Sequence, residues 1–310
     1  MPVSFSRLPR LVKQEVLTNM TPYDLFELYH CSKRCANLVP LGGTKKYQFS
    51  IDLPKLTISI RTGNFEHYTY SFGDILPGVI PAQSPKLQLK TFLLKLFDVF
   101  QFQQISCFNT GTSDFDTFAS IAKILIERKC IIANLNFQIQ QVREVELKNI
   151  LENLQIVNCL NFPETVKLSS NFKCQLSRFP EEMYIRNSSW FGFDQLCSAV
   201  NSSVKIELSK SSLTVRHINS FLEKWKAGEF PEMTAFFISI RNSKFSENGQ
   251  VLGIQLSQLT NWVNYPTVHR RFLGRHYGCV PGGIVVENVN GVKAVMNFES
   301  SSFFNFMVLA

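Results

Sequence analysis

The 310-residue sequence has few charged residues and no long uncharged apolar run. Asp, Glu, Lys and Arg make up 18% of the residues and hydrophobic types 45%, which is typical of a folded globular protein and not of a disordered chain. No segment approaches the ~18 uncharged apolar residues of a transmembrane helix. The start of the chain, MPVSFSRLPR, lacks the apolar run of a secretory signal peptide. We therefore expect a soluble protein of the cytoplasm, the nucleus or both, with no membrane partner.

The spacing of cysteine lacks the signatures of a zinc site or a disulfide framework. There is no Cys-x-x-Cys pair among the eight cysteines. The closest pair, Cys31 and Cys35, has no further Cys or His at zinc-finger distance. We therefore expect reduced, buried thiols, and neither a metal nor another cofactor.

Common catalytic motifs are missing as well. The sequence contains no Gly-x-Ser-x-Gly, P-loop, Gly-x-Gly-x-x-Gly or His-Glu-x-x-His motif. Its five histidines are dispersed, and none shares a segment with a candidate nucleophile and acid. Asp114 and Asp116 lie two residues apart, and capping of a helix explains them better than acid–base catalysis. The sequence therefore predicts a non-catalytic protein.

Positive charge is in excess, with a net charge of +8, but it is not concentrated. The densest basic cluster is HRRFLGRH at 269–276. Because a nucleic-acid interface gathers its basic residues on one face or element, scattered residues indicate an ordinary solvated surface. A nucleic-acid binder would depend on Arg270, Arg271 and Arg275, and the sequence does not favour that alternative.

The first 45 residues predict three short helices that carry more apolar surface than they can bury. Thr21 is placed to cap a helix that begins at Pro22, and Ser32 to cap the next one. Apolar residues recur at helical spacing in the first helix, at Leu11, Val12, Val16 and Met20. Because helices this small do not fold well alone, one face must pack internally and another must meet the rest of the chain or a partner.

The order of residues in this segment resembles an F-box, in particular those of the large nematode F-box family. The residues that carry the resemblance are Leu8, Pro9, Val16, Leu17, Met20, Asp24, Leu25, Leu28, Cys31, Ser32 and Lys33. The resemblance implies docking to a Skp-family adaptor, and through it to a cullin. The adaptor-binding residues that it implies are Leu8, Pro9, Val16, Leu17, Leu25 and Leu28. Some of these must instead form the small internal core.

A short apolar-any-apolar unit recurs through the middle of the chain. The units begin at Ile105, Leu135, Leu160, Met183, Ile206 and Ile238, at intervals of 30, 25, 23, 23 and 32 residues. Each unit is a short strand with one buried face, and helical patterns lie between several of them. This alternation predicts a leucine-rich-repeat-like βα solenoid with parallel strands. A conventional α/β sandwich of the same elements is the alternative.

Parallel stacking of these strands would leave one face of the sheet exposed. The residues between the buried strand positions are then candidate target contacts. They are Gln138, Tyr184, Arg186, Glu207, Ser209, Ser239 and Arg241. Simple exposure to solvent, without any target, is the alternative for most of them.

Residues 205–240 resemble the type-2 F-box-associated region of nematode F-box proteins. The residues that carry this resemblance are Leu208, Leu213, Ile218, Asn219, Phe221, Leu222, Trp225, Gly228, Phe230 and Pro231. The leucine that usually follows the proline is replaced by Met233, which conserves volume. The resemblance implies a C-terminal domain, with this region at about 205–275, that binds an unidentified target protein.

The end of the chain predicts a β-hairpin. Residues 282–300 alternate in polarity on both sides of Asn290-Gly291, and Asn-Gly is the strongest short hairpin signal. We expect this hairpin to cover the last strand edge of the solenoid.

Together these patterns predict an α/β protein in four parts. The parts are an F-box at 1–45, a connecting segment and N-terminal cap at 46–100, leucine-rich-repeat-like βα repeats at 101–265, and a C-terminal β-hairpin cap at 266–310. The resemblances imply the substrate-recognition subunit of an SCF-type cullin-RING E3 ubiquitin ligase. The alternative is a leucine-rich-repeat-like binding module outside any ligase, with the N-terminal helices as a simple cap.

Overall fold

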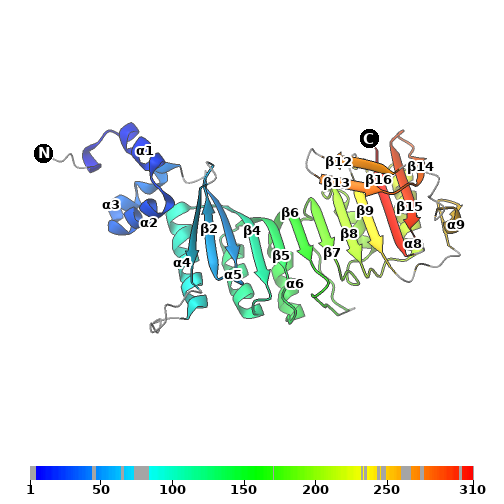
Figure 1. The fold of residues 1–310 in the computed structure, drawn as a ribbon, viewed down its shortest axis with the longest axis horizontal. Helices are drawn as coiled ribbons and strands as arrows, with labels where there is room; N and C mark the ends of the chain where they lie inside the picture. Colours follow the sequence, from blue (N-terminus) through cyan, green and yellow to red (C-terminus); the bar gives the residue numbers. More distant parts are fainter. Residues whose placement is uncertain are drawn as a thin grey trace. The chain divides into compact units, whose positions relative to one another are not determined.

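A computed structural model describes most of the chain (Figure 1). The described residues are 5–43, 47–63, 66–72, 84–169, 171–231, 233, 236–242, 245, 249–259, 267–272, 276–299 and 302–309. The chain divides into two compact units, unit 1 at Met1–Ala133 and unit 2 at Asn134–Ala310. Helices and strands alternate along both, so the predicted α/β class is confirmed.

Unit 1 begins with the short helices expected at the N-terminus. They are η1 (Phe5–Arg7), α1 (Arg10–Asn19), α2 (Pro22–Cys31), α3 (Lys33–Ala36) and η2 (Val39–Gly42). Thr21 Oγ1 accepts from the Asp24 backbone N–H at 3.2 Å, and the Asp24 carboxylate accepts from the Thr21 N–H at 3.1 Å. Ser32 Oγ accepts from the Cys35 N–H at 3.2 Å. These side-chain caps satisfy backbone donors that a helix leaves unpaired, and they fix where α2 and α3 begin.

The remainder of unit 1 is a sheet with two long helices. Its strands are β1 (Gln48–Asp52), β2 (Thr57–Arg61), β3 (His67–Ser71) and β4 (Gln104–Gly111), and its helices are α4 (Pro85–Phe100) and α5 (Phe115–Glu127). The strand order is β4-β1-β2-β3. The strand β1 is parallel to β4 and antiparallel to β2, which in turn pairs antiparallel with β3. The core is rich in phenylalanine, and the Phe102 ring stacks between those of Phe49 and Phe97 at 4.0 and 4.1 Å.

Unit 2 contains the larger share of the strands, and β5 crosses the division between the units. The elements are β5 (Ile131–Phe137), α6 (Glu144–Asn153), β6 (Gln155–Phe162), β7 (Glu182–Ile185), α7 (Phe193–Ala199), β8 (Lys205–Ser209), α8 (Val215–Lys226), β9 (Phe237–Arg241), β10 (Gln250–Val251), β11 (Ile254–Gln255), α9 (Leu256–Leu259), β12 (Val268–Phe272), β13 (His276–Val280), β14 (Ile284–Glu287), β15 (Lys293–Glu299) and β16 (Phe303–Val308). The strand order in its main sheet is β14-β15-β16-β9-β8-β7-β6-β5.

Four of the predicted repeat units lie side by side in matching register. The strands β6, β7, β8 and β9 are parallel, and Leu160, Met183, Ile206 and Ile238 are aligned across them. All four side chains are buried, as the alternation predicts. Side chains of α8 pack on the same core, where the Trp225 ring meets that of Phe306 edge-on at 5.1 Å.

The connection from β6 to β7 departs from the expected strand–helix alternation. In this connection the described residues, 163–169 and 171–181, contain no helix. Their apolar residues alternate with exposed ones, which is the period of an extended chain with one buried face. The buried positions are Val166, Leu168, Phe172, Cys174, Leu176 and Phe179.

The C-terminal hairpin forms where Asn290-Gly291 predicts it. The strands β14 and β15 pair antiparallel, and Gly291 has a φ of 78°, which a side chain would disfavour. Asn288 Oδ1 accepts from the N–H groups of Asn290 and Val292, each at 2.9 Å. The strand β16 pairs with both β15 and β9, so the hairpin is joined to the parallel strands through β16.

A second ribbon, β12–β13, was not predicted from the sequence. Its two strands pair antiparallel, and β13 contacts β15 and β16 (Figure 1). Val280 of the ribbon is buried in one cluster with Phe237, Val295 and Met307 of the sheet. The ribbon therefore covers the outer face of the sheet at its β9, β16 and β15 end, on the side away from the aligned core residues.

Candidate protein-binding surfaces

Helix α1 displays apolar side chains to solvent. The exposed fractions are 78% for Leu11, 43% for Val12 and 39% for Val16. Val12 and Val16 are one turn apart on the same face, and Leu11 is exposed beside that face; we refer to the three residues as the α1 strip. Grouped exposed apolar side chains on one helix are typical of a surface that meets another protein.

The structure sorts the six residues that the F-box resemblance assigned to adaptor binding. Leu17 and Leu25 are fully buried, so they belong to the internal core and can only support a contact. Leu8 and Leu28 are half-buried, whereas Pro9 and Val16 are exposed. Leu11 and Val12 were not among the six, although their helical spacing was the signal that could have placed them there.

The aromatic face of α2 is covered by unit 1 itself. The Tyr23 hydroxyl donates to the Thr69 backbone oxygen of β3 at 2.9 Å, and its ring lies 4.6 Å from that of Tyr70. The Phe26 ring lies 5.0 Å from that of Phe92 in α4. The second apolar face of the N-terminal segment thus packs largely on unit 1, although Tyr23 remains 40% exposed.

A buried tyrosine also joins the N-terminal helices to the sheet of unit 1. The Tyr47 hydroxyl, next to β1, donates to the Met20 backbone oxygen at 3.4 Å. Burial, with smaller contributions from Tyr68 and Glu66, raises the pKa of Tyr47 to about 12. The hydroxyl therefore stays protonated and remains a donor at all physiological pH values.

The outer face of the parallel strands in unit 2 carries a chain of polar contacts. Lys205 Nζ lies 3.1 Å from Glu207 Oε1 and 5.1 Å from the centre of the Tyr184 ring. The Tyr184 hydroxyl donates to Glu182 at 3.1 Å, and Arg186 pairs with Glu207 at 3.5 Å. Burial and the neighbouring Glu182 raise the pKa of Tyr184. The face is therefore mixed in charge and is held by interactions between adjacent strands.

Six of the seven predicted target contacts are at least partly accessible on this face. Arg186 and Arg241 are exposed, and the half-buried ones are Gln138, Tyr184, Glu207 and Ser209. Ser239 points to the predicted face but is only 7% exposed, so its assignment as an accessible contact has to be corrected. The reason is that the chain just after β13 packs on this part of the sheet. Asn305, opposite Ser239 on β16, donates to Asn297 at 3.0 Å, and Asn297 donates to the Pro281 backbone oxygen at 2.9 Å.

A pocket of about 430 Å³ lies between α6, the segment before β7, and α7. Gln195 donates to the Cys174 backbone oxygen at 3.0 Å and accepts from the Gly192 N–H at 2.6 Å. Glu152 accepts from the Gln175 N–H at 3.1 Å. Burial raises the pKa of the Cys174 thiol to about 12, so the thiol is protonated at neutral pH. These contacts hold the non-helical connection in place against α6 and α7.

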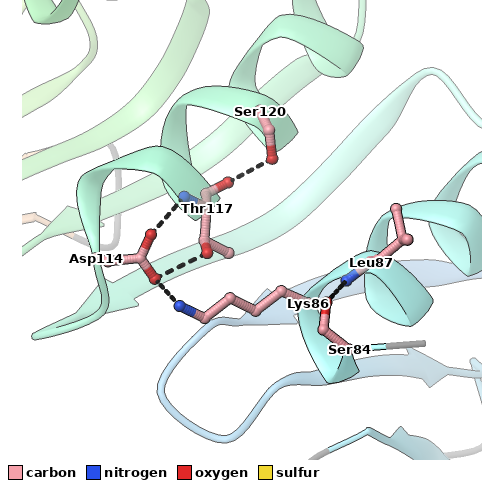
Figure 2. A network of polar contacts seen from close by, with 6 residues as sticks. All are labelled: Ser84, Lys86, Leu87, Asp114, Thr117 and Ser120. Atoms are coloured by element: carbon pink, nitrogen blue, oxygen red, sulfur yellow. Dashed lines mark hydrogen bonds and ion pairs between the residues drawn. The ribbon is translucent and has the colours of Figure 1, made fainter. Parts of the chain in front are cut away.

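Asp114 caps a helix, as the sequence suggested. Its carboxylate accepts from the Thr117 N–H at 2.9 Å, from the Thr117 hydroxyl at 2.8 Å and from Lys86 Nζ at 2.5 Å (Figure 2). Burial by itself raises the pKa of Asp114, but the hydrogen bonds from Lys86 and Thr117 outweigh it and lower the pKa to about 2. The group is therefore a constant negative charge that joins α5 to α4 at neutral pH.

Other predicted features have different outcomes. Only Cys130 and Cys174 are buried and Cys31 is exposed, so the expectation of uniformly buried thiols is wrong.

The side chains of Arg270 and Arg271, and all of Arg275, lie outside the described residues. Within the described ranges, no group of three or more His, Cys, Asp and Glu side chains could hold a metal ion. A helix long and apolar enough to cross a membrane is likewise absent from that part of the chain.

Comparison with known families gives one match in unit 2. Residues 167–238 match a family model described as F-box associated, a range that contains β7, α7, β8 and α8. The resemblance of residues 205–240 to an F-box-associated region is thereby supported by an independent comparison. Neither a curated protein nor a solved structure matches the chain. The family match points to a role in protein interaction.

Proposed function

We propose that this protein is the substrate-recognition subunit of an SCF-type cullin-RING E3 ubiquitin ligase, active in the cytoplasm or the nucleus. The observation that carries the proposal is the F-box-associated match at 167–238. It occurs in the same chain as N-terminal helices whose residue order resembles an F-box. The exposed α1 strip supports the proposal, because an adaptor-binding helix requires an uncovered apolar face.

In this proposal each unit has a separate binding task and neither carries out chemistry. The α1 strip binds a Skp-family adaptor, and through it a cullin. The sheet face of unit 2 binds the target protein. Holding the target near a charged ubiquitin-conjugating enzyme raises its effective concentration, which is sufficient for a subunit that forms no covalent bond.

We further infer that unit 2 works as a leucine-rich-repeat-like surface. The four aligned parallel strands β6–β9 support this inference, since each turns one buried apolar row to the core. Repeats of this kind provide extended binding faces on which several neighbouring strands contribute to one contact.

Co-purification of the full chain with a Skp-family adaptor tests the proposal. We expect the wild type to bind, and the Leu11→Asp/Val16→Asp double variant to bind at least about tenfold more weakly, because a charge would be buried in the contact. Both side chains are exposed in the free protein, so the variant should fold normally. Val145→Asp is the matched control, because Val145 is 86% exposed on helix α6 of unit 2.

The outcomes separate the two readings of the N-terminal helices. Loss of binding in the double variant, with retention in Val145→Asp, supports the adaptor interface. A well-folded wild-type chain that does not bind the adaptor would rule out the proposal. The alternative of a binding module outside any ligase would then be favoured.

A further inference from the structure

The carboxyl ends of the parallel strands in unit 2 bring three cations together. Arg186 follows β7, Lys210 follows β8 and Arg241 ends β9. Backbone hydrogen bonds tie these ends to one another: the Arg186 N–H donates to Phe162 O at 2.8 Å, and the Ser211 N–H donates to Arg241 O at 3.2 Å. Since neighbouring strands lie about 4.8 Å apart, the three residues form a row across one edge of the sheet face. We refer to Arg186, Lys210 and Arg241 as the cation row.

Two carboxylates of the chain already pair with this row, Glu207 with Arg186 and Glu164 with Lys210. Glu164 follows β6, and its Oε1 lies 2.5 Å from Lys210 Nζ. This ion pair reaches across the end of β7, which lies between β6 and β8. The hydrogen bond and charge of Lys210 lower the pKa of Glu164, and the charges of Arg186 and Arg241 lower it further. All three cations therefore act on this single carboxylate, although its side chain is 67% exposed.

Other contacts keep the cations at the surface. Arg186 is shared with Glu207, at 3.5 Å, and its side chain is 49% exposed. The Arg241 guanidinium lies 4.8 Å from the centre of the Phe303 ring, an arrangement that holds the charge without neutralising it. A guanidinium held on an aromatic ring still presents its N–H donors at its edge, where they can bind a carboxylate.

The backbone at the centre of the row is unusual. Lys210 has a φ of 51°, in the left-handed region that residues with a side chain rarely adopt. In the described part of the chain Leu56, Gln101, Lys129 and Leu252 share this conformation, so at Lys210 it marks the turn that ends β8.

We propose that the cation row binds an acidic segment of the target protein, whose Asp or Glu carboxylates displace Glu164. The Glu164 carboxylate, which Lys210 holds in an exposed ion pair, shows that the row accommodates a carboxylate. Exposed pairs of this kind are weak and exchange readily with other partners of the same charge. The inference rests on the proposed function in so far as the bound segment belongs to a ligase target.

A fluorescein-labelled hexaglutamate peptide, titrated with the full chain, tests the inference without any adaptor. We expect Glu164→Gln to bind about two- to fivefold more tightly, because it removes the competing carboxylate of an exposed pair. We expect Lys210→Glu/Arg241→Glu to bind at least about tenfold more weakly, because two attractive charges become repulsive. Binding of the wild type should also weaken with added salt.

The chain offers a matched control in another exposed ion pair. Lys224 Nζ lies 2.6 Å from Glu229 Oε2 at the end of helix α8, with side-chain exposures of 40% and 51%. This pair has the chemistry of the Glu164–Lys210 pair but lies outside the cation row. Glu229→Gln and Lys224→Glu should leave hexaglutamate binding unchanged.

Three results would overturn the inference. Wild-type binding that is absent, or insensitive to the cation-row variants, would do so, as would an equal response to the Glu229 and Lys224 controls. A further outcome is tighter binding of a phosphoserine peptide or single-stranded DNA of equal charge, with the same dependence on the cation row. That result would show that the row binds this ligand and not a carboxylate segment. Adaptor co-purification of the same variants is expected to be unchanged, so failure of this inference and failure of the ligase proposal are distinguishable.

Discussion

Helices α1 and α2 have the same length of ten residues and adjoin in sequence, yet they end in opposite environments. Helix α1 begins without a side-chain cap and exposes the α1 strip. Helix α2 begins with a capping box and packs its aromatic face on β3 and α4. The comparison shows that apolar content alone does not decide burial. What decides is whether the remainder of the chain offers a complementary surface, and for the α1 strip the described residues do not.

The largest difference between the two helices should appear on truncation of a leucine in each. Leu25→Ala in α2 removes a fully buried side chain, and we expect a loss of about 2–5 kcal/mol in local stability. Leu11→Ala in α1 should change it by less than about 0.5 kcal/mol, because Leu11 is already solvated. Amide hydrogen exchange of the α2 residues in the full chain measures both. Similar losses in the two variants would contradict the assignment of inner and outer faces.

A smaller effect is expected from the cap that distinguishes α2 from α1. Thr21→Ala removes the acceptor for the Asp24 N–H, and caps of this kind contribute about 1 kcal/mol. Faster amide exchange in the first turn of α2 is the expected result. Thr214→Ala, which removes the corresponding cap of α8, is the control and should accelerate exchange in α8 only. If α2 is unaffected by Thr21→Ala, its packing on β3 and α4 alone sets its start.

The smallest effect concerns a helix whose cap is also an ion pair. Asp114 caps α5 and pairs with Lys86 of α4, and its pKa is lowered from 3.8 to about 2. A lowered pKa in the folded state gives stability that is present above the unfolded value and is lost as pH falls from about 3.8 through about 2. Asp114→Asn should therefore lower thermal stability at neutral pH, and the difference from the wild type should shrink below pH 3. A pH-independent difference would show that the carboxylate charge contributes little.

Local signals in the sequence predicted local structure well. Thr21 and Ser32 marked the starts of α2 and α3, because a helix cap depends on only a few adjacent residues. Asn290-Gly291 located the β14–β15 turn for the same reason. The alternation at 160–240 also predicted which side chains face the core, since register in a half-buried sheet follows the apolar pattern.

Features that depend on distant residues could not be predicted in the same way. The burial of Ser239 follows from the chain just after the β12–β13 ribbon, where Pro281 and Gly282 meet Asn297 on a strand remote in sequence from Ser239. The burial of Leu17 depends on how α1 packs against η2, and that of Leu25 on how α2 packs against α3, α4 and η2. The cation row was only partly foreseen. Arg186 and Arg241 were recognised by alternation. Alternation fails for Lys210, whose left-handed backbone breaks the strand period, and for Glu164, which lies two residues past the end of β6.

The cation row and its carboxylate also set a length. Glu164 follows β6 and Arg241 ends β9, so a segment that contacts the whole row crosses the ends of four neighbouring strands, from β6 to β9. Three strand spacings amount to about 14 Å. A fully extended chain covers that distance in about four residues. The segment bound at this edge is therefore expected to be a short linear motif, whose specificity depends on the position of one or two acidic residues.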